Sequence, residues 1–170
     1  MPQSSIKNDS RVEQFVRIAG AYCNLIDSCE NMSKEEFVRA IGKTLGKLFA
    51  AAIELLEVRI DVSEHYEAMT MSHDDWSKLF SSLRKKLGDD DGYWIVFDPY
   101  NEEAPVFTSL SDDLSDIYRD LRSGLDAFGK SERDSHEAVW IWQFGFQGHW
   151  GHHCSCAMRP ISKLLEAMDE

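Results

Sequence analysis

The 17 residues WIWQFGFQGHWGHHCSC, from Trp140 to Cys156, decide how this chain folds. They contain three of the five tryptophans, two phenylalanines and three glycines. On a helical wheel the apolar side chains fall on every side, whereas a surface helix confines them to one stripe. The pattern therefore predicts a central helix with neighbouring helices all round it.

The same stretch holds the strongest candidates for chemistry. His152, His153 and Cys156 lie three, four and seven residues after His149, so one face of a helix can present all four side chains. Imidazoles and thiols are metal ligands, and an imidazole is also a general base. The spacing matches no motif with an established mechanism, because the His-Glu-x-x-His and Glu-x-x-His patterns are absent.

Working outward from this stretch, capping residues followed by apolar residues at helical spacing predict the remaining helices. The glycines Gly88 and Gly129 end two of them. The predicted helices run from Ser10 to about Ser28, from Ser33 to about Glu57, from Ser72 to Gly88, from Ser109 to Gly129, and from Ser131 to about Met168.

We therefore expect an all-α protein, a single-domain bundle of five or six helices over residues 10–168, with a flexible N-terminus at 1–9. Residues 59–71 keep no clear period and are expected to connect two helices. Pro160 should bend or break the last helix, which places an interruption within residues 148–160.

One irregular extended segment, about 89–108, is expected between the helices. Asp89–Gly92 is expected to form a solvated turn, because the alternating ligands of a calcium loop are missing. Tyr93–Phe97 is a short apolar run with no convincing second strand to pair with, so it should pack as an extended stretch over the helices. Pro105 keeps the following residues irregular.

Length and charge narrow the classes of function. With 18 basic and 30 acidic side chains, the 170-residue chain carries a net charge of −12, which repels phosphate backbones and excludes nucleic acid as a partner. No run of about 18 apolar residues spans a membrane, and the first residues lack the apolar core of a signal sequence. The four cysteines do not form a disulfide framework. We expect a cytoplasmic protein with reduced thiols.

A second group of polar residues lies on the predicted helix that begins at Ser109. Asp113, Asp116 and Asp120 fall within about 60° of one another on the wheel and flank the apolar face instead of opposing it. Three carboxylates that border a core face are less ordinary than three on the solvent side. The alternative is that Asp112 and Asp113 complement the helix dipole, and that the other aspartates are solvated or pair with Arg119 and Arg122.

The chain resembles a bacterial family of unknown function, numbered 5063 in the domain-of-unknown-function series. The resemblance rests on residues 109–121 (SLSDDLSDIYRDL), on Trp140-x-Trp142 and on His149-Trp-Gly-x-His153, and the first helix and residues 93–99 also look similar. It implies a small, mostly helical bacterial domain. The resemblance gives no indication of what activity the protein has.

Two function classes follow from these residues. In the first, Asp113, Asp116 and Asp120 face His149 and His153 across the bundle and bind a divalent metal, zinc, manganese or iron, that activates water for hydrolysis.

In the second, the same polar residues only stabilise the core, in a network with Tyr118, Arg119, Trp142 and His152, and no cofactor is bound. A metal-free base at His149 or His153 is a further possibility. If the cluster is structural, the protein is a partner-binding or regulatory module, and its acidic field favours a basic protein. The sequence ranks this role ahead of metal-dependent hydrolysis and leaves open whether the protein is an enzyme.

Overall fold

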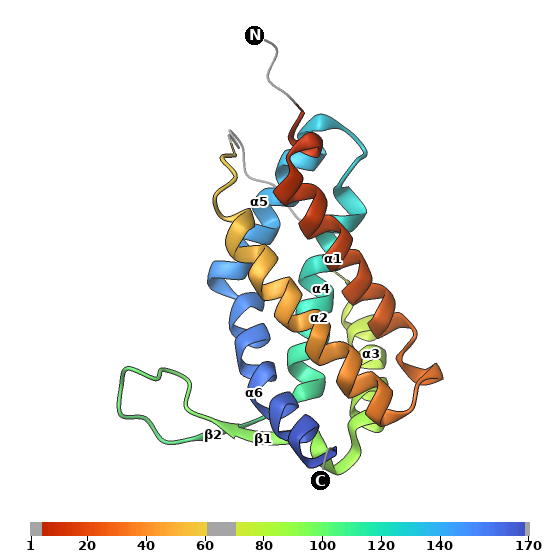
Figure 1. Ribbon diagram of the computed structural model, residues 1–170, viewed down its shortest axis with the longest axis vertical. Coiled ribbons are helices and arrows are strands. Elements are labelled where there is room, and N and C mark those ends of the chain that lie inside the picture. Colours follow the sequence, from red (N-terminus) through yellow and green to blue (C-terminus); the bar gives the residue numbers. More distant parts are fainter. Residues whose placement is uncertain (1–4, 61–70, 169–170) are drawn as a thin grey trace.

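The computed structural model describes residues 5–60 and 71–168 and confirms the all-α bundle (Figure 1). The predicted connection at residues 59–71 lies mostly outside the described residues. The helices of the described part are α1 (Ser10–Asp27), α2 (Lys34–Leu55), α3 (His73–Leu87), α4 (Leu110–Ala127), α5 (Glu132–Gly148) and α6 (Trp150–Met168).

Local capping chemistry sets the helix starts. Ser33 and Glu36 form the predicted capping box of α2, and Ser72, Ser109 and Ser131 each accept a backbone N–H at the start of their helices. The prediction for α1 is wrong by one residue, because Asp9 and not Ser10 accepts the hydrogen bond that caps this helix.

Gly88 ends α3 with a φ of 61°, a conformation that glycine adopts without strain.

Within the stretch expected to be a flexible N-terminus, Ile6–Asn8 form a short 3₁₀ helix, η1, in which Ile6 is buried and its N–H donates to the carboxylate of Glu132.

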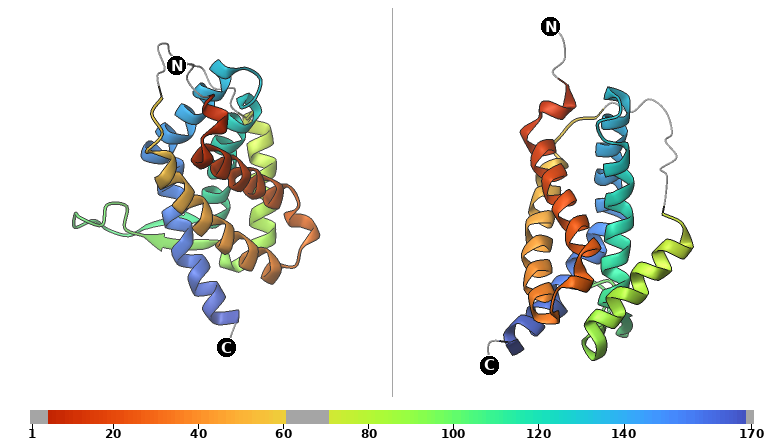
Figure 2. Two further views of the ribbon diagram at one scale, coloured as in Figure 1. Left: turned by 45° about the horizontal axis from the view of Figure 1, so that its top comes forward. Right: turned by 90° about the vertical axis from the view of Figure 1, so that its right-hand side faces the viewer.

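α4 lies at the centre of the bundle. It packs against α1, α3, α5 and α6, and in the right-hand view of Figure 2 it stands between the α1–α2 pair and α3. The stretch that the sequence singled out contributes large core side chains, but the prediction that it forms the central helix is wrong, because α4 has that place and Phe144 is 62% exposed. Trp142 and Trp150 are the largest fully buried side chains, and both rings contact Phe15 of α1.

The last predicted helix is interrupted at His149, within the expected range 148–160. α5 ends at Gly148, His149 leaves helical geometry with φ −150° and ψ −84°, and α6 starts at Trp150. The attribution of the break to Pro160 is wrong, because this proline lies inside α6. The junction instead depends on Gly151, where a Cβ atom would lie 2.1 Å from the carbonyl oxygen of Phe146.

The expected irregular segment contains a β-hairpin, so the prediction that residues 93–97 lack a partner strand is wrong. β1 (Gly92–Ile95) pairs antiparallel with β2 (Val106–Ser109), with Trp94 opposite Phe107. Pro105 does not oppose this pairing, because a proline just before a strand removes no ladder hydrogen bond. We name residues 92–109 the hairpin; it projects sideways from the bundle (Figures 1 and 2).

The turn before the hairpin was expected to be solvated, and this prediction is wrong for one of its aspartates. Asp91 is buried, and its carboxylate accepts hydrogen bonds from the N–H (2.7 Å) and the hydroxyl (2.8 Å) of Ser111 at the start of α4. A carboxylate at a helix N-terminus satisfies free amides, which explains why this one of the three aspartates is inside.

No helix among residues 5–60 and 71–168 combines the length and the apolar character that crossing a membrane requires.

Candidate metal centre

The structure brings the five candidate site residues together. α4 presents Asp113, Asp116 and Asp120 at spacings of three and four, and the junction of α5 and α6 presents His149 and His153 at a spacing of four. Because α4 packs against α6, the two rows face each other. We name these five residues the Asp–His cluster.

Each imidazole of the cluster has its own aspartate. His149 Nδ1 lies 2.6 Å from Asp120 Oδ2, and His153 Nδ1 lies 2.8 Å from Asp113 Oδ1. An ionised carboxylate only accepts hydrogen bonds, so both Nδ1 atoms carry the proton. In the neutral imidazole the Nε2 atom then holds a free lone pair.

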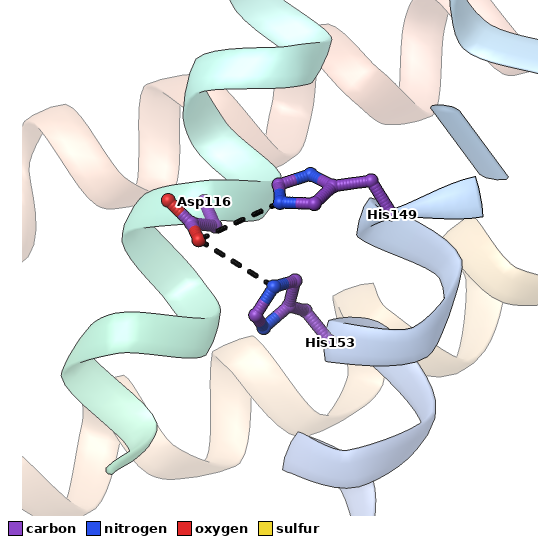
Figure 3. A group of neighbouring side chains, drawn as sticks. All are labelled: Asp116, His149 and His153. Carbon is purple, nitrogen blue, oxygen red and sulfur yellow. Dashed lines mark ion pairs between the residues drawn. The ribbon is translucent and has the colours of Figure 1, made fainter. Parts of the chain in front are cut away.

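The two Nε2 atoms point toward a third carboxylate, as Figure 3 shows. Asp116 Oδ2 lies 3.8 Å from His149 Nε2 and 3.4 Å from His153 Nε2. One ligand atom from each of these residues falls within 4.8 Å of the others. A small cation can therefore contact two imidazoles and one carboxylate at once.

The other oxygen of Asp116 is held by donors. Asp116 Oδ1 accepts from Trp76 Nε1 of α3 at 2.9 Å and lies 3.1 Å from Nη2 of Arg119. These contacts fix the carboxylate and leave Oδ2 directed at the histidines. Asp113 is fixed similarly, because its Oδ2 accepts from the hydroxyl of Tyr93.

Electrostatics at the cluster favour a cation. Burial alone lowers the pKa of His153, but the hydrogen bond to Asp113 and the charges of Asp113 and Asp116 outweigh this effect and raise the pKa above its ordinary value. Burial and the charge of Asp113 raise the pKa of Tyr93, so the phenol stays protonated and donates a hydrogen bond to Asp113.

Solvent reaches the cluster from two sides. A cavity of about 930 Å³ between α3, α4 and α5 is lined by Asp116 and His149 together with Trp76, Trp140 and Phe144. A second cavity of about 470 Å³ lies under the hairpin and is lined by His149 and His153. The side chain of Asp116 is 13% exposed and that of His149 is 40% exposed, so a bound ion would keep a position open to solvent.

The residues of the predicted structural network divide between the cluster and the core. Arg119 borders the cluster, since its Nε also lies 3.7 Å from Asp120. Tyr118 donates to Asp27 and buried Trp142 donates to the carbonyl of Leu121, both away from the cluster. His152 packs on Phe97 of the hairpin with ring centroids 4.5 Å apart.

Two side chains that donate hydrogen bonds to the cluster, Trp76 and Tyr93, were not predicted from the sequence. Trp76 lies in the helix predicted to begin at Ser72 and was not a candidate site residue, and Tyr93 was expected to be part of an apolar run. Asp112 was also not among the candidates, yet it forms a second group of three possible ligands with Asp113 and His153. This second group is the weaker candidate, because Nδ1 of His153 already donates to Asp113.

The chain matches a known protein family and is similar in fold to a solved structure. A family model described as domain of unknown function (DUF5063) matches residues 6–167, which confirms the resemblance seen in the sequence. The crystal structure of protein BF1032 from Bacteroides fragilis superposes with a TM-score of 0.81 at 22% sequence identity, over 93% of this chain and 94% of that one. This similarity concerns the fold. No curated protein matches the sequence.

Proposed function

We propose that this chain, which belongs to the DUF5063 family, binds a divalent metal ion through Asp116, His149 and His153 and uses it for hydrolysis. The observation that carries the proposal is the shared orientation of the two imidazoles. Both direct Nε2 at Asp116 Oδ2, and both have Nδ1 bound to a separate aspartate.

This arrangement supports metal binding more than a purely structural network. In proteins, a metal-bound histidine commonly donates its other ring N–H to a carboxylate, which fixes the tautomer and raises the basicity of the ligating nitrogen. Asp120 and Asp113 stand in that position behind His149 and His153. A structural role needs only one hydrogen bond for each histidine and does not require both Nε2 atoms to meet at one carboxylate.

The ligand set limits the metal and its chemistry. Two imidazoles and one carboxylate suit zinc, manganese or iron, and three protein ligands leave a coordination position for water. Zinc, if held there, would lower the pKa of a bound water to about 7 and so make hydroxide available at neutral pH. The cavity lined by Asp116 and His149 would admit a substrate to that position.

Calorimetric titration of the chain with Zn²⁺, Mn²⁺ and Fe²⁺ tests the proposal. We expect one ion to bind per chain, with binding lost in the variants His149→Ala and His153→Ala. His152→Ala is the matched control, because this histidine lies in the same stretch and packs on Phe97 but offers no ligand atom to the group of Asp116, His149 and His153. Equal binding by all three variants, or none by the parent chain, would contradict the metal site.

A partner-binding or regulatory role is the second candidate function. The observation that favours it is the distribution of charge, since residues 87–118 contain nine acidic side chains and no lysine, arginine or histidine. A surface of this sign attracts a basic protein by long-range steering. Asp91 and Asp113 of this set are buried, but Glu102 and Glu103 are exposed and lie outside the Asp–His cluster, so the two candidates are compatible.

A further inference from the structure

The hairpin carries most of the large apolar side chains that the described residues leave exposed. Among residues 5–60 and 71–168, nine large apolar side chains are exposed, and six of them belong to the hairpin. Tyr100 is 95% exposed and Trp94 is 68% exposed. An exposed apolar patch of this kind marks an interaction site. The six are Trp94, Val96, Phe97, Tyr100, Val106 and Phe107.

The charges that the hairpin itself carries are all negative, although Arg84 of α3 lines a cavity beside Phe107. Glu102 and Glu103 are exposed at its tip, Asp98 lies beside them, and no basic side chain occurs between Lys86 and Arg119. A partner that covers the aromatic rings must therefore meet carboxylates at the rim. Only a partner with positive charge gains from that contact.

We infer that the hairpin is a docking surface for a basic protein segment that also carries apolar side chains. This inference names the surface and the partner's chemistry for the second candidate function, and it does not require the metal ion. A second copy of this chain fits poorly, because two molecules of charge −12 would bring acid-only hairpins together. Nucleic acid is repelled for the same reason.

The hairpin is held in place before any partner arrives. Its base is anchored by the hydrogen bond from Tyr93 to Asp113, and its outer part by the packing of Phe97 on His152. Phe107 covers Gly92 so closely that a Cβ atom there would lie 2.4 Å from the ring. A surface that is already ordered loses less conformational entropy on binding.

The aromatic pair at the centre supplies the contacts that a basic, apolar segment can use. Trp94 and Phe107 face each other across the strands with ring centroids 5.3 Å apart. Their faces can contact an aliphatic side chain or a lysine or arginine cation. Glu102 and Glu103 would raise the rate of encounter and contribute less to the final affinity.

A labelled synthetic peptide of alternating lysine and leucine is the probe, and fluorescence anisotropy gives its dissociation constant from the chain. One variant removes aromatic area (Trp94→Ala with Tyr100→Ala), and another removes charge (Glu102→Gln with Glu103→Gln). The matched control, Glu13→Gln with Glu54→Gln, removes the same charge from exposed positions of α1 and α2.

We expect the aromatic variant to bind the peptide at least about ten-fold more weakly and the hairpin charge variant about three-fold more weakly, with the control unchanged. A lysine–serine peptide should bind far less tightly than the lysine–leucine peptide. Both hairpin variants should keep the parent's circular dichroism and its metal binding, which separates this result from any failure of the metal site.

Four results would overturn the inference. They are no binding of the lysine–leucine peptide, equal loss of affinity in the control variant, equal affinity for the lysine–serine peptide, and self-association of the parent chain that the aromatic variant abolishes. The last result would assign the hairpin to contacts between copies.

Discussion

Replacement of Asp120 by asparagine isolates the contribution of the residue behind a metal ligand. In the proposed site Asp120 does not touch the metal but accepts from Nδ1 of His149 at 2.6 Å. Asparagine keeps the size of the side chain and still offers an oxygen, but it removes the negative charge. Hydrogen bonds to a charged group are roughly twice as strong as neutral ones, so the imidazole becomes a weaker ligand.

The size of the effect follows from this geometry. Loss of such a partner weakens metal affinity by about 10- to 100-fold, which is about 1.4 to 2.8 kcal/mol. The side chain of Asp120 is 21% exposed, so water screens little of its charge. We therefore expect Asp120→Asn to bind the ion clearly more weakly but still at one ion per chain.

Competition with a coloured chelator measures this change. Asp126→Asn is the control, because Asp126 lies on the same helix, carries the same charge and pairs with Arg122 at the exposed surface, away from the histidines. Its affinity should equal that of the parent chain. An Asp120→Asn chain with parental affinity, or an equal loss in Asp126→Asn, would refute the role of Asp120.

Three further predictions concern the surroundings of the site. Gly124→Ala should lower the free energy of unfolding by about 2 kcal/mol, because the new Cβ would lie 2.2 Å from Nε1 of buried Trp142. This loss outweighs a gain of about 1 kcal/mol in helix propensity, and an unchanged urea midpoint would contradict it. Trp76→Phe removes the donor to Asp116 Oδ1 and should weaken metal binding about three-fold in the chelator assay. Parental affinity in this variant would show that the hydrogen bond does not contribute to metal binding. Burial raises the pKa of Cys154 from 9.0 to about 12. The folded chain therefore keeps a proton that the unfolded chain loses, and stability falls above pH 9 by up to about 1.4 kcal/mol per pH unit, a slope that urea unfolding should find reduced in Cys154→Ala.

The bundle and the cluster could be predicted because both depend on helical periodicity. The carboxylates of α4 and the histidines of the last stretch each repeat at intervals of three and four residues, so their faces follow from the sequence alone. That the two faces meet was an assumption, which the contact between α4 and α6 supports.

The missed features all depend on contacts between residues distant in sequence. β1 and β2 are separated by ten residues, and neither is long enough to show the alternation that identifies a strand. Asp91 looked solvated beside two other aspartates, and only the packing of α4 shows that it is buried. Trp76 reaches Asp116 from a helix 40 residues away, and nothing local distinguishes it from a core tryptophan.

The start of α1 and the break before α6 show a different limit. Asp9 and Ser10 are both good capping residues, and periodicity does not separate neighbours. Gly148, Gly151 and Pro160 each could interrupt a helix, and the close approach of Phe146 to Gly151 decides between them. The site depends on this detail, because His149 is the residue at the break.

The metal content of untagged chain, purified without chelator, tests the central claim most directly. Elemental analysis of the parent chain beside Asp116→Ala should find close to one zinc, manganese or iron per parent chain and almost none in the variant. A parent chain that is fully helical yet holds no metal, and takes up none when incubated with each of the three ions, would contradict the claim. The Asp–His cluster would then be part of the core alone.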